Sequence, residues 1–149
     1  MISIPRIWGL FVLAMVFAKP ALALDPVYND FFGNAIKGYD PVAYFTVGKA
    51  TKGDSDFVYE WQGADWKFSS QQNLEAFKAN PDKYAPQYGG YCAWAVSKGY
   101  TAKIDPQAWH IHDGKLYLNY SKSVQADWLE DIPGNIAKGD RNWPALLAE

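Results

Sequence analysis

Two segments of the chain alternate between apolar and polar residues, and a glycine turn interrupts each of them. The first covers residues 57–68 and turns at Gln62-Gly63, and the second covers residues 107–120 and turns at Asp113-Gly114. Alternation with a period of two is typical of half-buried strands, and Asp-Gly between two such runs is the strongest short signal for a tight turn. The pattern therefore predicts two β-hairpins.

A serine and a short amphipathic stretch follow each predicted hairpin. Ser69 or Ser70 is placed to cap a helix over residues 71–79, which Asn80-Pro81 ends. Ser121 is placed to cap a second helix, which ends at Ile132-Pro133-Gly134, because serine is a preferred N-cap and proline interrupts helices. Three further segments complete the prediction: a loop over 48–56, a helix from Tyr91 to near Gly99, and a last helix from Asn135 into Gly139 with Trp143-Pro144 and Leu146-Leu147 folding back.

The two hairpin–helix units share one spacing. Gly63 and Gly114 lie 51 positions apart, and so do Ser70 and Ser121. A duplicated or pseudo-symmetric unit explains this spacing; the alternative is that small α+β domains reuse hairpin–helix units for packing reasons. The predicted fold class is therefore α+β: a small single domain built of two β-hairpin plus short-helix units.

Residues 1–23 have the features of a secretory signal peptide. Arg6 precedes an uncharged run over residues 7–18, and Ala21-Leu22-Ala23 has the small residues of a cleavage site. The alternative is an uncleaved anchor, but the run is shorter than the roughly 20 residues that a membrane span needs. We therefore expect residues 1–23 to be removed, and residues 24–149 to work in the periplasm or outside the cell without a stable membrane anchor.

Removal of the signal changes the net charge of the protein and the set of residues that could bind a soft metal. The whole chain has 14 basic and 16 acidic residues; without Arg6 and Lys19 the balance is 12 to 16, a net charge of −4. This charge argues against nucleic-acid binding, which needs basic residues to displace counterions. Both methionines belong to the predicted signal, so Cys92, His110 and His112 are the only soft-metal ligands that remain.

Cys92 is the first candidate for chemistry. It follows Gly89-Gly90 at the predicted start of a helix, where the helix dipole would lower its pKa and favour the thiolate. His110 and His112 share one face of a predicted strand, and with Cys92 they would make a His₂Cys set that suits copper. The alternatives are a buried cysteine acting as a small apolar residue and two histidines on a solvated strand face.

Aromatic residues make up 17% of the chain. One interpretation is a pocket for a flat or apolar cofactor-like ligand next to Cys92; the alternative is that the rings stabilise a small domain without disulfides. Asp40 and Asp105 each precede a proline and are interpreted as turn or cap residues rather than catalytic acids. The predicted pocket is lined by Tyr39, Tyr44, Tyr88, Tyr91 and Trp94.

Several of these motifs resemble the YHS-domain family. The resemblance rests on Asp40-Pro41-Val42, the hairpin and serines over 61–70, the helix Asn73–Phe77 and the segment Asn80–Tyr84. Residues 88–93 and 113–119 are similar to the exported bacterial subgroup of that family, in which a selenocysteine can replace a cysteine. The resemblance implies that metal-handling members carry cysteines at positions that correspond to Ala43, Ser69 and Asn73 here.

Three functions remain open at this point. The resemblance implies a non-enzymatic protein that binds or handles a metal such as copper through Cys92, His110 and His112. The first alternative is a thiol-redox protein in which Cys92 alone reacts, with a small thiol as its partner, because the chain has no second cysteine. The second alternative is a non-catalytic interaction module whose protein partner the sequence does not identify.

Overall fold

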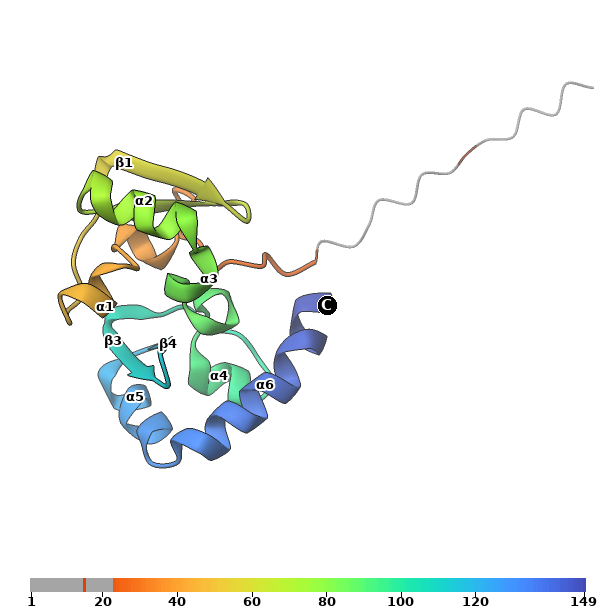
Figure 1. Cartoon of the computed structure of the whole chain (residues 1–149). Helices are drawn as coiled ribbons and strands as arrows, with labels where there is room; N and C mark the ends of the chain where they lie inside the picture. The colour runs from red at the N-terminus through yellow and green to blue at the C-terminus, as the bar shows by residue number, and fades with distance from the viewer. Residues whose placement is uncertain (1–14, 16–22) are drawn as a thin grey trace, which may run out of the picture.

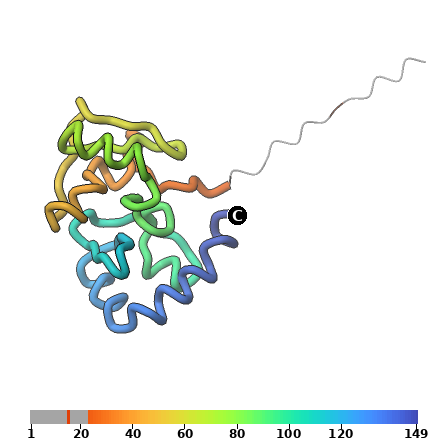
Figure 2. Tube along the Cα trace, viewed as in Figure 1, coloured from red at the N-terminus to blue at the C-terminus, as the bar shows by residue number. Residues whose placement is uncertain are grey.

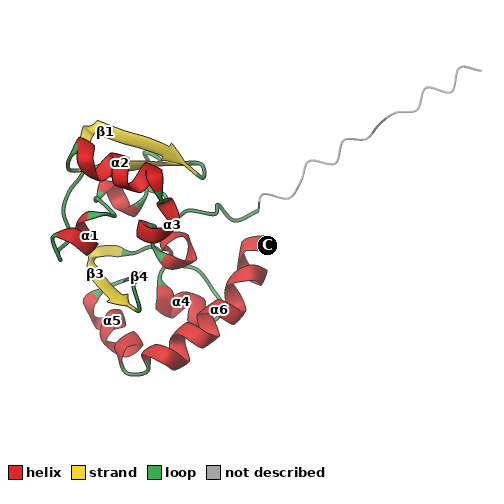
Figure 3. Cartoon of the chain, viewed as in Figure 1, coloured by secondary structure: helices red, strands yellow, loops and turns green. Residues whose placement is uncertain are grey.

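The computed structural model describes Met15 and residues 23–149, and the predicted signal peptide otherwise lies outside these described residues. The described chain is α+β, as predicted, and it contains two separate two-stranded antiparallel sheets (Figure 1; Figure 3). Strands β1 (Asp54–Trp61) and β2 (Ala64–Phe68) form the first hairpin. Strands β3 (Asp105–His112) and β4 (Lys115–Asn119) form the second hairpin.

Helices surround the two hairpins in the same order. Each unit begins with a short 3-10 segment and a short helix, continues with its hairpin, and ends with two helices. The first unit contains η1 (Ile36–Gly38), α1 (Ala43–Thr46), α2 (Gln71–Ala79) and α3 (Pro81–Tyr84). The second unit contains η2 (Gln87–Gly90), α4 (Ala93–Ser97), α5 (Lys122–Leu129) and α6 (Ile132–Ala148), and it lies below the first in Figure 2.

The hairpins and their following helices repeat at the spacing that separates Gly63 from Gly114. All four strand boundaries of the first hairpin recur in the second after this shift, from Asp54 at Asp105 to Phe68 at Asn119. Each hairpin has the same irregularity in register, directly after Asp54 in the first and directly after Asp105 in the second. Each following helix begins at a serine whose hydroxyl accepts an amide three positions later. These matches support the predicted pseudo-symmetric unit.

The side-chain packing repeats as well. The rings of Trp66 and Phe77 stack at 4.9 Å and 31°, and the rings of Tyr117 and Trp128, at the equivalent positions of the second unit, stack at 5.0 Å and 35°. Aromatic stacking in this offset, tilted range is favourable beyond the area that it buries. The equivalent positions therefore keep both the hairpin–helix backbone and the ring pair that joins hairpin to helix.

The segment before each short helix repeats too. Here the spacing is 52 positions rather than 51, so that Ile36 corresponds to Tyr88. Ile36, Lys37 and Gly38 have φ values of 49°, 52° and 83°, and residues 88–90 have φ values of 58°, 61° and 81°. Left-handed backbone disfavours residues with a Cβ. Three such residues in succession at both places show that the chain makes the same turn twice. The repeat therefore extends upstream of the hairpins to Asp40 in one unit and Cys92 in the other.

The C-terminal segment differs from the prediction of a short helix with a returning tail. Helix α6 is continuous from Ile132 to Ala148, through Pro144. Pro133 lies in its first turn, where a missing amide hydrogen is harmless, and the Asp131 carboxylate caps the helix by accepting from Gly134. The helix packs along α4, and this burial favours one continuous helix over a fold-back.

Two smaller boundaries also differ from the prediction. The predicted loop over 48–56 gives way to β1 at Asp54, and the helix expected from Tyr91 to near Gly99 is confined to α4, Ala93–Ser97.

Within the part of the chain that the structure describes, no helix has the length and apolar character that a membrane crossing needs.

Candidate functional site

Asp40 is a buried carboxylate that joins α1 to the end of the first hairpin. One of its oxygens, Oδ1, accepts from the amides of Val42 at 2.8 Å and Ala43 at 3.2 Å. The other oxygen, Oδ2, accepts from the amide and hydroxyl of Ser69 and from the side-chain amide of Asn73, all within 2.8 Å. Asp40 is therefore a cap residue, as predicted, and it also satisfies donors from a distant part of the chain.

Cys92 occupies the equivalent place in the second unit, because it follows the second left-handed turn as Asp40 follows the first. Its Sγ accepts from the amide of Tyr120 at 3.3 Å, and Tyr120 is the equivalent of Ser69. The backbone amides of Trp94 and Ala95, at the positions of Val42 and Ala43, also favour the sulfur anion, but the Trp94 amide donates its hydrogen bond to Asn119. The scaffold that holds a carboxylate in the first unit thus holds a thiol in the second.

The surroundings of Cys92 nevertheless favour the protonated thiol. Only 1% of the residue is exposed, and desolvation by this burial raises the pKa of the thiol, although the three amides oppose the rise. The prediction of a pKa lowered by a helix start is therefore wrong, because α4 is a single short turn and burial is the larger effect.

We expect the alkylation rate of folded Cys92 to increase about tenfold per pH unit between about pH 7 and 8.5, because the thiolate is the reacting form. The rate is measured with iodoacetamide by intact-protein mass spectrometry, with the Cys92→Ser variant as the control that takes no label. A plateau in the rate within this range would contradict the raised pKa.

A cavity of about 260 Å³ adjoins the thiol. Its walls carry three aromatic rings, those of Trp94, Tyr100 and Tyr120. Of the five aromatic residues predicted to line a pocket at Cys92, only Trp94 lines this one. Tyr44, Tyr88 and Tyr91 are buried in the core instead, and Tyr39 packs against it. Large rings are needed to fill the core of a small domain, and this requirement accounts for the difference.

Asn119, at the end of β4, lies against Cys92. Its Oδ1 accepts from the amide of Trp94 at 3.0 Å and from the thiol of Cys92 at 3.6 Å. Its Nδ2 is fully buried and has no acceptor in the structure. An unpaired buried donor costs about 1–3 kcal/mol. Asn119 therefore retains a buried donor without an acceptor.

The histidines lie elsewhere on the second hairpin. The His110 ring packs against Trp128 at 6.0 Å, as Tyr59 packs against Phe77 at 6.2 Å in the first unit. Burial lowers the pKa of His110, and the nearby His112 lowers it further. His110 therefore occupies the position of Tyr59, at which the repeat packs a ring against the following helix.

His112 is at the position of Trp61 in the first unit, next to the hairpin turn. In the described residues, no three His, Cys, Asp or Glu side chains lie close enough together to hold a metal ion. The structure thus does not assemble the predicted ligand set of Cys92, His110 and His112, because the repeat places both imidazoles where the first unit has packed aromatic rings.

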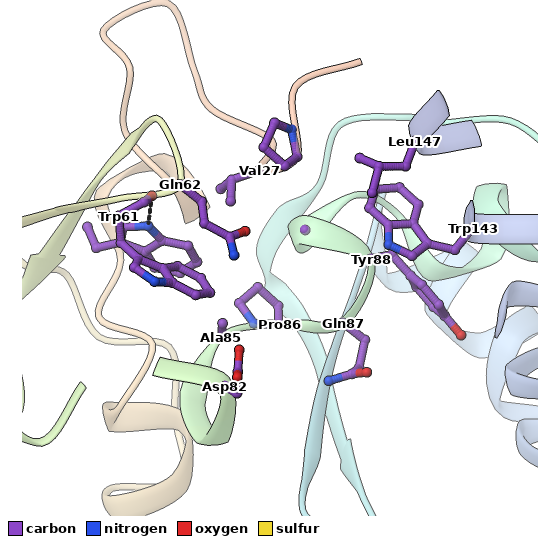
Figure 4. Close-up of a pocket in the computed structure, with 13 residues that line it drawn as sticks. Val27, Trp61, Gln62, Asp82, Ala85, Pro86, Gln87, Tyr88, Trp143 and Leu147 are labelled. Atoms are coloured by element: carbon purple, nitrogen blue, oxygen red, sulfur yellow. Dashed lines mark hydrogen bonds between the residues drawn. The ribbon is translucent and has the colours of Figure 1, made fainter. Parts of the chain in front are cut away.

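A second cavity, of about 340 Å³, lies between the tip of the first hairpin and the C-terminal part of α6 (Figure 4). Trp61 and Gln62 form one side of it, and Tyr88, Trp143 and Leu147 form the other. A third cavity, of about 300 Å³, occupies the corresponding place beside His112 and Asp113 at the tip of the second hairpin. The repeat therefore explains both cavities as gaps beside equivalent hairpin tips.

These features define a class of protein: a small α+β protein of two copies of one hairpin–helix unit, with a single buried thiol in the second copy. Residues 42–88 match the family model of the YHS domain, and this match confirms the resemblance to the YHS-domain family over that segment. The match covers the first unit from Val42 onward, without η1, and ends at Tyr88 in η2. Searches of curated proteins and of solved structures found no significant match. The YHS domain is associated with copper-handling proteins.

The family positions gather in this structure. Ala43, Ser69 and Asn73, the positions at which the resemblance implies cysteines in metal-handling members, all bond to Asp40. Their equivalents in the second unit are Ala95, Tyr120 and Val124, and all three line the cavity at Cys92. Sequence reasoning missed Asn119 and Tyr120. The spacing of the repeat, which aligns Asp40 with Cys92, is the signal that could have found them.

Proposed function

We propose that this is an exported YHS-domain protein that acts through the single thiol of Cys92, which exchanges with small disulfides outside the cytoplasm. The observation that carries the proposal is the placement of Cys92 in the second copy of a cradle that holds a carboxylate in the first copy. A cradle of backbone amides stabilises an anion, and the sulfur anion is the nucleophile in exchange. The adjoining cavity gives a small molecule a place beside the sulfur.

The exchange step uses only the thiol and the disulfide. Cys92 loses its proton to solvent, and its sulfur attacks one sulfur of R–S–S–R. The Cys92–S–R bond forms, the R–S–S–R bond breaks, and R–S⁻ leaves and takes up a proton. Cys92 is oxidised while the leaving sulfur is reduced. A second small thiol restores Cys92, since the chain holds no other cysteine.

The test is modification of the folded protein by a small disulfide at neutral pH. Intact mass should show one adduct on Cys92 and none on Cys92→Ser, with the circular dichroism spectrum unchanged. The rate should be independent of urea well below the unfolding transition, because the native cavity provides the access. A rate that rises exponentially with urea from the lowest concentrations would show that only unfolded molecules react, and would reject the proposal in favour of a structural cysteine.

Copper handling at the same thiol is a second candidate, and the family match favours it. Cu(I) suits a thiolate ligand. Within the described residues, however, no group of three His, Cys, Asp or Glu side chains includes Cys92, so we expect the copper ion to take a further ligand from a small thiol or a partner protein. In this candidate the protein passes copper on rather than storing it.

The copper candidate predicts one Cu(I) per protein only when a small thiol is present. Cys92→Ala should remove this copper, whereas His110→Ala and His112→Ala should leave it unchanged. Copper content is measured after gel filtration. Equal copper in the wild type and in Cys92→Ala would exclude this candidate without affecting the exchange proposal.

A further inference from the structure

Two lysines lie over rings of residues that line the cavity beside Cys92. The Nζ of Lys98 lies 4.2 Å from the centre of the Trp94 ring, and the Nζ of Lys103 lies 5.8 Å from the centre of the Tyr120 ring. Trp94 and Tyr120 both line the cavity, whereas the lysines themselves do not. In the part of the chain that the structure describes, neither lysine is within ion-pair distance of a carboxylate.

The rest of the lining has no negative charge. Besides the three rings, the wall is formed by Cys92, Ala95, Ala102 and Val124, so among the described residues none that lines the cavity is acidic. The cavity thus combines aromatic and apolar walls with two lysines that lie over rings of its lining residues.

We infer that the cavity beside Cys92 binds a small anionic molecule with an apolar or aromatic body, and that anionic disulfides are the substrate class of the exchange. This inference rests on the proposed function. The lysines attract the negative groups, and the rings pack against the body. The net charge of residues 24–149 is −4, from 12 basic and 16 acidic residues, so a preference for anions would come from the local site.

The experiment compares three disulfides that differ chiefly in charge: dithiodipropionate with two carboxylates, bis(2-hydroxyethyl) disulfide with none, and cystamine with two ammonium groups. Rates of adduct formation on the folded protein are divided by rates on the urea-unfolded protein, which removes the reactivity of each reagent itself. We expect the normalised rate to be about three- to tenfold higher for dithiodipropionate than for the neutral disulfide, because exposed charge pairs have modest energies. Cystamine should react most slowly.

The lysines are tested by substitution. Lys98→Gln with Lys103→Gln should reduce the preference for the anion by at least about threefold, and added salt should do the same. Lys78→Gln is the matched control, because Lys78 also lies over a ring, that of Tyr59, but in the first unit. It should leave the preference unchanged.

The outcomes separate this inference from the proposed function. Equal normalised rates for the three disulfides, or a preference that survives the double substitution, would overturn the anionic substrate class while the exchange function stands. Failure of all three disulfides to modify the folded protein, while the unfolded protein reacts, would overturn both.

Discussion

Trp128→Ala is expected to lower the free energy of unfolding by about 3–5 kcal/mol, the range for removal of a large buried ring. The Trp128 side chain is fully buried and stacks on Tyr117 at 5.0 Å, which joins α5 to the second hairpin. It also contacts the ring of His110. The variant is measured by urea denaturation, with the fluorescence of the other tryptophans as the signal.

Trp128→Phe is the informative partner of this variant. The equivalent residue in the first unit is Phe77, so a phenyl ring is already compatible with the hairpin–helix junction. The buried Nε1 of Trp128 has no acceptor in the structure. Phenylalanine lacks this unpaired donor, and its removal stabilises the folded protein by about 1–3 kcal/mol. This gain offsets part of the loss caused by the smaller ring. We expect Trp128→Phe to lose less than half of what Trp128→Ala loses. Equal losses would mean that the indole, rather than a stacked ring, is required.

The hairpins and the helices after them can be predicted because their signals are local. The turn at Gln62-Gly63 has both φ values positive, at 50° and 77°, and Asp113-Gly114 has 50° and 73°, as a two-residue hairpin loop requires. The sequence predicts helix α2 at its observed bounds, 71–79, because its serine cap and its proline stop are both local signals. The continuity of helix α6 to Ala148 could not be predicted, because it depends on packing along α4, which is far from α6 in the sequence.

The candidate site could be predicted only in part for the same reason. Cys92 stands out as the one cysteine, and Trp94 follows it closely. Asn119 and Tyr120 reach the thiol from the end of β4, far along the chain, through the antiparallel pairing of the second hairpin. The prediction that Cys92 lies with His110 and His112 was based on the alternation of side chains along a strand. Alternation places the two imidazoles on the same side of the strand, but it does not say which element covers that side.

Asp40→Ala is expected to lower the free energy of unfolding by about 3 kcal/mol or more. The substitution leaves five donors without their acceptor, and each unsatisfied buried donor costs about 1–3 kcal/mol before relaxation. The effect is large because the carboxylate links two separate regions, the start of α1 and the residues Ser69 and Asn73 after the first hairpin. Thermal and urea denaturation of the variant measure the loss.

Asp40→Asn removes the negative charge and replaces one acceptor oxygen by a donor, while the shape of the side chain is nearly unchanged. An asparagine in this place directs its Nδ2 group either toward the donors from Ser69 and Asn73 or toward the amides of α1, so donors face donors in both orientations. We therefore expect a loss close to that of Asp40→Ala, although the side chain is nearly isosteric. Asp105→Ala is the matched control, since the Asp105 carboxylate accepts from one exposed amide, that of Gln107, and a lost cap costs about 1 kcal/mol. A tolerated Asp40→Asn would mean that the first cradle does not need an anion, and it would weaken the argument that its copy around Cys92 is built to stabilise one.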